Sequence, residues 1–172
     1  MIERTLVILK ADAVQRGLMG RILQRFEDVG LKVVGAKMVW VDKAFAEKHY
    51  WDVEERYEKI KGEGYGKKVL NRLTDYLAEG PVMAFCIEGA QAVKIARKLV
   101  GTTYPNESAP GTIRGDFAHA SQYHADNVNP KGELKNLIHA SGKPEEAQKE
   151  IALWFAEKEL HSYNTVHDVH VL

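Results

Sequence analysis

The sequence has little cysteine, few prolines and no long hydrophobic run. Cys86 is the only cysteine in the chain, which excludes an internal disulfide. It lies in the apolar run Val-Met-Ala-Phe-Cys-Ile, which predicts a buried structural thiol rather than a reactive one. No run of about 18 apolar residues occurs, and no cationic start is followed by an apolar stretch. We therefore expect no membrane segment and a cytoplasmic protein.

Neither positively nor negatively charged residues are in excess. Lys and Arg together number 24, as do Asp and Glu, so the formal net charge is zero. A protein dedicated to binding nucleic acid usually carries a positive surface, so this balance argues against that class. The pattern Gly-x-x-x-x-Gly-Lys-Ser/Thr is also missing, which excludes a P-loop nucleotide site. With 172 residues and ordinary hydrophobic content, the chain is expected to form one domain over residues 1–172.

Segments typical of buried strands alternate with segments typical of amphipathic helices. Apolar and β-branched runs predict strands at residues 5–9, 31–41, 81–87 and 134–139. Apolar side chains at helical spacing predict helices at residues 14–29, 43–51, 66–79, 90–100 and 144–157. Residues 101–133 lack periodicity and predict a long loop, and residues 160–172 are expected to be irregular.

This order of elements predicts an α+β fold of the ferredoxin-like type. Such a βαββαβ sandwich has a four-stranded antiparallel sheet, and we expect the helices on one of its faces. The long loop falls before the fourth strand. Because a loop of that length inside a compact domain is often functional, we expect it to contribute to a site.

A histidine and a glutamate are the first candidates for chemistry. His139 ends the fourth predicted strand, and Glu150 lies at the edge of the apolar stripe of the next helix. A histidine held by a carboxylate is a standard way to make an imidazole nucleophilic. Taken singly, His139 is more simply a core histidine and Glu150 a member of a structural ion pair.

Other polar residues lie at the ends of elements or in the long loop. Lys10 ends the first strand, where it either enters a ligand crevice or turns outward. Arg97 lies beside an apolar helix face and needs an anion, either a ligand or a neighbouring acidic residue. Ser141 could cap the last helix, and Thr103 and Arg114 could merely hold the loop. Together, these residue types are those that bind and attack a triphosphate.

A series of short segments carries a family resemblance. In chain order they are Glu3-Arg4-Thr5, Lys10-Ala11-Asp12, His49-Tyr50, Glu79-Gly80-Pro81-Val82, Gly111-Thr112-Ile113-Arg114-Gly115-Asp116-Phe117, Asn136-Leu137-Ile138-His139-Ala140-Ser141 and Glu150-Ile151-Ala152-Leu153-Trp154-Phe155. With these segments the chain resembles the nucleoside diphosphate kinases over most of residues 2–163. The combination of Thr-Ile-Arg-Gly-Asp-Phe with Asn-x-x-His-x-Ser is highly specific.

The resemblance implies a ping-pong transfer of the γ-phosphoryl group from ATP, or another nucleoside triphosphate, to a nucleoside diphosphate. By position in the motifs, it implies that His139 is the phosphorylated nucleophile and that Glu150 and Ser141 orient it. The residues implied to hold the phosphates are Arg97, Thr103 and Arg114, and Tyr50 is implied to lie beside the transferred group. Lys10 and Asn136 are implied to contact the ribose hydroxyls, with Lys10 also reaching the phosphates. Mg²⁺ is expected to arrive on the nucleotide phosphates, with no metal ligands from the protein.

The chain departs from the family pattern at two insertions. The first, near residues 57–68, replaces the segment that supplies the aromatic side chain that stacks on the base. Tyr57 is the first candidate for that role, and the others are Ile60, Tyr65 and Val69. Within this insertion, the glycines at positions 62–66 predict a mobile surface loop.

The second insertion, near residues 118–133, lies between Arg114 and His139. We expect it to cover the site or to contact a neighbouring subunit. Its His119 and His124 are a weak metal signal, and a solvated loop is the better interpretation.

The resemblance also implies a homo-oligomer, with a hexamer expected ahead of a tetramer or a dimer. Two alternative functions for this chain are a catalytically silent nucleotide-binding protein and an RNA-binding module on a ferredoxin-like sheet. The first is disfavoured because the histidine, its carboxylate and the arginines are all present. The second is disfavoured by mostly aliphatic strands and zero net charge.

Overall fold

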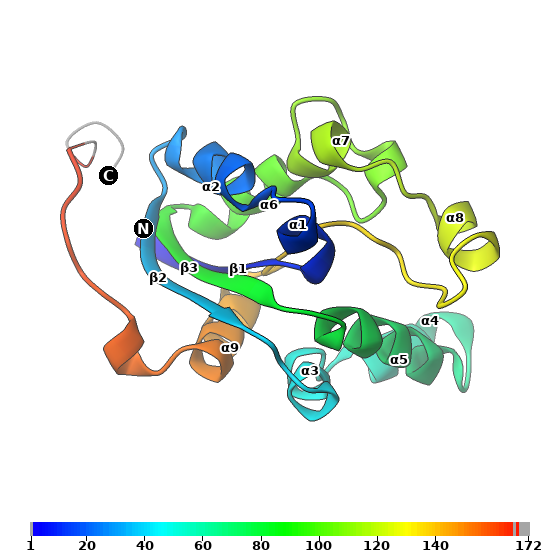
Figure 1. The fold of residues 1–172 in the computed structure, drawn as a ribbon. Helices are drawn as coiled ribbons and strands as arrows, with labels where there is room; N and C mark the ends of the chain where they lie inside the picture. Colours follow the sequence, from blue (N-terminus) through cyan, green and yellow to red (C-terminus); the bar gives the residue numbers. More distant parts are fainter. Residues whose placement is uncertain (1, 167, 169–172) are drawn as a thin grey trace.

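A four-stranded antiparallel sheet is the centre of the fold in the computed structural model, which describes residues 2–166 and 168. Its strands are β1 (Ile2–Leu9), β2 (Lys32–Val39), β3 (Val82–Ala90) and β4 (Ile138–Ala140). They lie in the order β2-β3-β1-β4, and every neighbouring pair is antiparallel (Figure 1). The predicted α+β, ferredoxin-like architecture is therefore confirmed.

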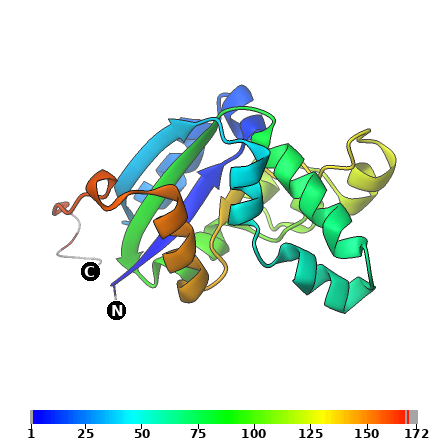
Figure 2. The ribbon, with the colours of Figure 1, turned by 90° about the horizontal axis from the view of Figure 1, so that it is seen from below.

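Helices cover both faces of the sheet, whereas the sequence led us to expect them on one face (Figure 2). Val7 and Leu9 of β1 pack into one core cluster, and Leu6 and Ile8 pack into the other. A strand that is apolar on both sides must be covered on both sides, which is why the expectation was wrong. The first cluster is completed by α2 (Met19–Glu27) and α6 (Ala92–Val100), and the second by α3 (Lys43–His49), α5 (Tyr65–Ala78) and α9 (Pro144–Trp154).

Several predicted boundaries shift for local reasons. The predicted helix at 14–29 is two helices, α1 (Ala11–Gln15) and α2, because Gly17 takes the left-handed conformation with φ 66° and interrupts the helix. The predicted strand at 134–139 begins only at Ile138, because Leu137 has φ 67°, far from an extended conformation.

The segment predicted as a long loop contains three short helices. They are η1 (Pro105–Glu107), α7 (Ile113–Phe117) and α8 (Gln122–Asn127). Thr112 caps α7 by accepting from the Gly115 N–H, and Ser121 caps α8 by accepting from the His124 N–H. Helices this short show no clear periodicity, so the sequence pattern missed them.

The first predicted insertion forms a helical hairpin. Helix α4 (Val53–Lys61) turns at Gly62 and Gly64, both with positive φ, and α5 returns against it. The predicted surface loop at 62–66 is therefore a tight turn. In Figures 1 and 2 this hairpin and α8 lie together at one end of the sheet.

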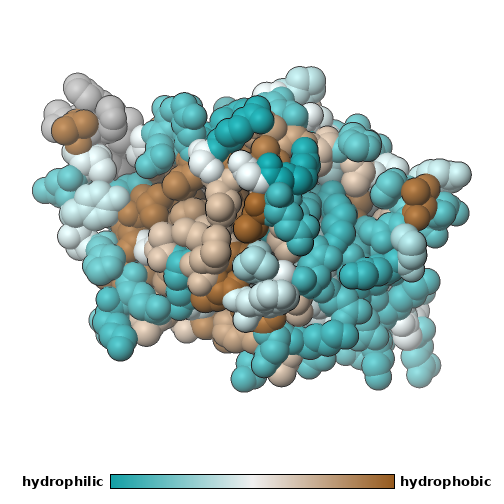
Figure 3. All heavy atoms as spheres, viewed as in Figure 1, coloured by the Kyte–Doolittle hydropathy of each residue, from teal (hydrophilic) through white to brown (hydrophobic). Residues whose placement is uncertain are grey.

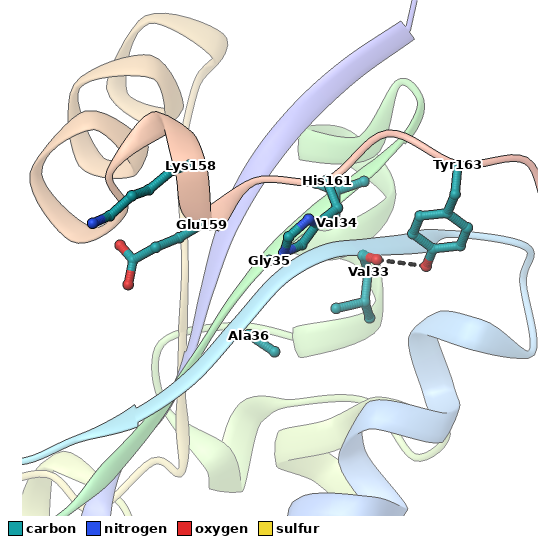
Figure 4. A pocket seen from close by; sticks show the side chains of 8 residues that line it. All are labelled: Val33, Val34, Gly35, Ala36, Lys158, Glu159, His161 and Tyr163. Carbon is teal, nitrogen blue, oxygen red and sulfur yellow. Dashed lines mark hydrogen bonds between the residues drawn. The ribbon is translucent and has the colours of Figure 1, made fainter.

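The carboxyl-terminal segment runs along the exposed edge of β2 (Figure 4). The last helix ends at Trp154 rather than near residue 157, and η2 (Glu157–Glu159) follows it. The His161 N–H donates to the Val34 carbonyl at 2.7 Å, and the Tyr163 hydroxyl donates to the Val33 carbonyl at 2.5 Å. These two hydrogen bonds cover part of the edge of β2, at Val33 and Val34. Residues 160–166 form no helix or strand, as predicted, and 167 and 169–172 lie outside the described residues.

The face of the molecule seen in Figure 3 has separate apolar and polar regions. Apolar residues gather over β2 and β3, whereas the end that carries α4 and α5 is largely hydrophilic (Figure 3). Among the described residues, no helix has both the length and the hydrophobicity needed to cross a membrane. Cys86 is buried, as predicted, and burial raises the pKa of its thiol to about 11.

Two glycines, each at the second position of its helix, should differ in how replacement by alanine changes the free energy of unfolding. A Cβ on Gly66 would lie 2.0 Å from the Glu54 carbonyl oxygen, whereas a Cβ on Gly20 would meet nothing within 4 Å. We expect Gly66→Ala to lower the free energy of unfolding by about 1–3 kcal/mol through overpacking. Gly20→Ala should leave it unchanged or raise it by up to about 1 kcal/mol. Urea unfolding followed by circular dichroism measures both, and equal effects would contradict the packing of the hairpin.

Candidate active site

A cleft beside β4 collects side chains from distant parts of the chain. Helices α3, α6 and α9 and strand β4 all contribute to its walls. Among the polar and aromatic residues that line it are His49, Tyr50, Arg97, Thr103, His139 and Glu150. Five of these six were predicted as site residues, and His49 was not.

His139 is held by a buried carboxylate, as the sequence suggested. Its Nε2 lies 3.0 Å from Oε1 of Glu150, and Oε2 of Glu150 accepts from the Ser141 hydroxyl at 2.5 Å. An ionised carboxylate only accepts, so this bond assigns the imidazole proton to Nε2. Nδ1 is then the ring nitrogen with a free lone pair. The His139 side chain is 20% exposed, so it is not the fully buried core histidine of the alternative interpretation.

Ser141 fixes the strand that carries His139. The Leu6 N–H donates to its hydroxyl oxygen at 3.1 Å, and its own N–H donates to the Leu6 carbonyl at 3.2 Å. The N-cap of α9 is Lys143, so the alternative role of Ser141 as a helix cap is wrong. One buried serine therefore ties β4 to β1 and orients the carboxylate of Glu150.

His49 forms a buried wall next to His139. Their ring centroids are 4.5 Å apart, and the rings are nearly perpendicular, at 81°. Trp154 Nε1 donates to His49 Nδ1 at 3.2 Å, so His49 carries its proton on Nε2. Burial, and next the proximity of His139, lower the pKa of His49 well below its usual value, so the ring is neutral at pH 7. Only its place in the His-Tyr motif could have signalled this residue.

His49, His139 and Glu150 also form the kind of cluster that can hold a metal ion, because their ligand atoms lie within 4.8 Å of one another. The tautomer of His49 argues against this use. Its Nδ1 lone pair is engaged by Trp154, and its Nε2 bears the proton, so His49 has no lone pair to offer. The cluster therefore fits an oriented nucleophile better than a metal site.

Arg114 is buried behind the cleft. Its guanidinium donates to the carbonyl oxygens of Asn136 at 3.1 Å, Thr102 at 2.6 Å and Ile138 at 2.6 Å. Burial, and next the charge of Arg97, lower the pKa of Arg114 to about 10, so it stays charged at pH 7. Arg114 thus shapes the turn before β4, and the N–H donors not used by these carbonyls are left for another acceptor.

Lys10 is buried and paired with an amide. Its Nζ donates to Asn136 Oδ1 at 2.8 Å, and Asn136 Nδ2 donates to the Thr103 carbonyl at 3.0 Å. Lys10 is only 4% exposed, so the interpretation that it turns outward is wrong. Burial, and next the charge of Arg114, lower the pKa of Lys10 to about 7. The structure therefore brings together the lysine and the asparagine that the motifs assigned to one role.

A tyrosine that the sequence did not signal supports this turn. The hydroxyl of Tyr76 accepts from the N–H groups of Asn136 at 3.0 Å and Leu137 at 3.3 Å. The Lys10 ammonium lies 4.4 Å from the centroid of the Tyr76 ring. These contacts hold Leu137 in its strained left-handed conformation.

Arg97 and Tyr50 complete the cleft with a free cation and a proton donor. Arg97 is exposed there, and within residues 2–166 and 168 it forms no ion pair. The alternative of an internal salt bridge is therefore not realised. Burial, and next the charge of Glu150, raise the pKa of Tyr50, so its hydroxyl keeps its proton at pH 7. An anion in this cleft would meet both groups.

The first insertion contributes to an adjoining hollow. Tyr57, Tyr65 and Val69 line it, whereas Ile60 is 66% exposed and does not. Ile60 is therefore no longer a candidate for base stacking, and Tyr57 remains one.

The histidines of the second insertion lie elsewhere. His119 and His124 line a separate hollow, together with Asp12 and Lys135, that does not include His139. Within the described part of the chain, they do not join a third residue as a possible metal cluster.

Comparison with known proteins decides the family. The family model "Nucleoside diphosphate kinase" matches residues 3–160. A nucleoside diphosphate kinase of Pyrococcus furiosus is 43% identical over 162 residues, which cover 94% of this chain and 88% of that protein. One of Pyrococcus horikoshii is 45% identical, covering 94% of this chain and 90% of its own length. The chain belongs to the nucleoside diphosphate kinase family.

Solved structures of nucleoside diphosphate kinases share the whole fold. The enzyme of Borrelia burgdorferi, described as a transition-state mimic with bound vanadate and ADP, superposes with a TM-score of 0.89 at 38% identity, covering 99% of this chain and 96% of that one. An enzyme of Halobacterium salinarum in complex with CDP gives a TM-score of 0.77 at 36% identity, covering 98% and 97%. The predicted family, fold and enzyme class of this nucleoside diphosphate kinase family member are thus confirmed.

Removal of the Ser141 hydroxyl tests how much the hydrogen bond from Ser141 to the buried Glu150 carboxylate contributes to the stability of the protein. We expect Ser141→Ala to lower the free energy of unfolding by about 1–3 kcal/mol, because Glu150 and the Leu6 N–H each lose a buried hydrogen bond. The matched control is Ser162→Ala at an exposed serine, expected within about 0.5 kcal/mol of the unmodified protein. Urea unfolding measures both, and two equal values would contradict the buried network.

Proposed function

We propose that this nucleoside diphosphate kinase family member uses His139 to carry the phosphoryl group from ATP, or another nucleoside triphosphate, to a nucleoside diphosphate. The single observation that carries this proposal is the bond from His139 Nε2 to buried Glu150, which leaves Nδ1 as a free base in the cleft. A neutral imidazole with one oriented lone pair is a suitable nucleophile for a phosphorus centre.

In the first half-reaction, the Nδ1 lone pair forms a bond to the γ-phosphorus, and the bond from that phosphorus to the β–γ bridging oxygen breaks. The electron pair leaves with the nucleoside diphosphate, and the phosphoryl group remains on Nδ1. The imidazole becomes cationic while Nε2 keeps its proton, and the Glu150 carboxylate compensates that charge at 3.0 Å. In the second half, a terminal oxygen of another nucleoside diphosphate attacks the same phosphorus and frees His139.

The remaining side chains supply positive charge and hydrogen bonds rather than covalent chemistry, as a loose phosphoryl-transfer transition state requires. Unpaired Arg97 and Thr103 are proposed to hold the phosphates, with the unused donors of Arg114 behind them. Tyr50 donates toward the transferred group. Lys10 and Asn136 meet the ribose hydroxyls, and Lys10 also meets the phosphates.

Mg²⁺ is proposed to enter on the nucleotide phosphates, without protein ligands. Magnesium prefers oxygen donors in an octahedral arrangement. The one candidate metal cluster found in the described residues contains two imidazoles, which does not match that preference. When bound to the phosphates, the ion neutralises charge that develops on their oxygens.

Three further expectations stay predictions. They are a homo-oligomer, with a hexamer ahead of a tetramer or a dimer, a cytoplasmic location, and a single domain over residues 1–172. A catalytically silent role is disfavoured because His139, Glu150, Arg97 and Arg114 are all present and the first two are bonded.

Labelling the protein tests the proposed intermediate. Incubation with γ-labelled ATP and Mg²⁺, without acceptor, should transfer the label to the protein as an acid-labile, base-stable adduct, because His139 forms a phosphoramidate. Adding GDP should release the label. A folded His139→Ala variant should take up none, and labelling at the unmodified rate would show that another residue is the nucleophile.

Binding of a nucleotide should protonate Lys10. Its pKa of about 7 leaves it mostly neutral at pH 8, and a phosphate beside it favours the charged form. We therefore expect ADP binding at pH 8 to take up close to one more proton in the natural protein than in Lys10→Gln, and affinity to fall as pH rises above 7. Calorimetry in buffers of different ionisation enthalpy measures the uptake, and equal uptake in both proteins would contradict this role.

A further inference from the structure

The catalytic cleft continues into a second hollow to which both insertions contribute. Tyr57, Leu73 and Thr103 line both spaces, so the spaces are contiguous. His139 lies in the first space, and Gln122 and Ala125 of α8 line the second. A ligand that places its phosphates at His139 would therefore extend toward α8.

Helix α8 is held against the hairpin by a short polar network. Asp126 accepts from Arg72 Nη1 of α5 at 3.0 Å and from Gln122 Nε2 at 2.5 Å. Gly132, just after α8, packs against the same arginine, since a Cβ there would lie 2.6 Å from its guanidinium. Arg72 thus contacts the second insertion at two places and sets the distance between α8 and α5.

The hollow has the chemistry of a site for a flat, polar-edged ring. The rings of Tyr57 and Tyr65 lie with centroids 6.3 Å apart and an interplanar angle of 39°. The face of a tyrosine ring can stack on any nucleobase, largely without regard to which base it is. Gln122 uses its Nε2 on Asp126, so its carbonyl oxygen is the group left to accept from a ligand.

We propose that α8 is the outer wall of the nucleobase subsite and that Gln122, oriented by Asp126 and Arg72, contacts the base edge. This inference rests on the proposed function, because the base reaches the hollow only when the phosphates occupy the His139 end. It assigns the second insertion a role in base-dependent affinity rather than in phosphate chemistry. A base with an N–H donor on its edge would match the free Gln122 carbonyl.

The experiment compares two acceptors that differ only in the base. Protein labelled on His139 with γ-labelled ATP is freed of nucleotide, and the second-order rate of label loss is measured with ADP and with ribose 5-diphosphate. The rate with ADP divided by the rate with ribose 5-diphosphate measures how much the base contributes to transfer. Gln122→Ala and Asp126→Asn should each lower this ratio about three- to tenfold by slowing transfer to ADP, with transfer to ribose 5-diphosphate unchanged.

The matched control is Glu55→Gln, which also neutralises a carboxylate in an exposed ion pair, with Lys59 on α4, outside both spaces. Its ratio should equal that of the unmodified protein. Unchanged ratios in both α8 variants would overturn the inference, and so would equal slowing with both acceptors, which would place the effect on the phosphate end. Failure of the unmodified protein to take up label would instead refute the proposed function.

Discussion

The buried carboxylate of Glu150 is the constraint on which the catalytic centre depends. A charge that is 4% exposed is costly unless hydrogen bonds compensate it, and here Ser141 and His139 supply them. Through Ser141 the same carboxylate is tied to Leu6 of the central strand. One electrostatic requirement therefore sets the position of α9 against β4, the tautomer of His139 and the nitrogen that remains free.

A second requirement operates behind the cleft, where the buried Lys10 and Arg114 hydrogen-bond to no carboxylate of residues 2–166 and 168. Their charges are compensated by an amide oxygen and by backbone carbonyls of the turn before β4. Because that turn must present its carbonyls inward, Leu137 is forced into a left-handed conformation, which Tyr76 holds by accepting two N–H groups. The positive charge of Arg114 is thus in place before any ligand arrives, which is the form of preorganisation that phosphoryl transfer uses, whereas Lys10, with a pKa of about 7, completes its charge when the ligand binds.

The two insertions lie together although the second begins some distance along the chain from the first. The hairpin α4–α5 and helix α8 lie at one end of the sheet and are joined by Arg72 and Asp126 (Figures 1 and 2). The apolar face of α5 packs into the core, and nothing in the sequence pattern shows that α8 lies against this hairpin. Their contact includes the ion pair of Arg72 with Asp126 and the close approach of Gly132 to Arg72, which a sequence pattern does not reveal.

The sequence by itself determined the order of the strands and of the longer helices, the family and the principal polar residues of the cleft, because apolar periodicity and short motifs are local properties. It did not show that both sheet faces are covered, that Arg114 is bound by carbonyls, or that His49 and Tyr76 support the site. Only the tertiary structure decided these points. Burial and the pairing of buried polar groups depend on segments far apart in sequence, such as Trp154 against His49, and no local pattern encodes which of them meet.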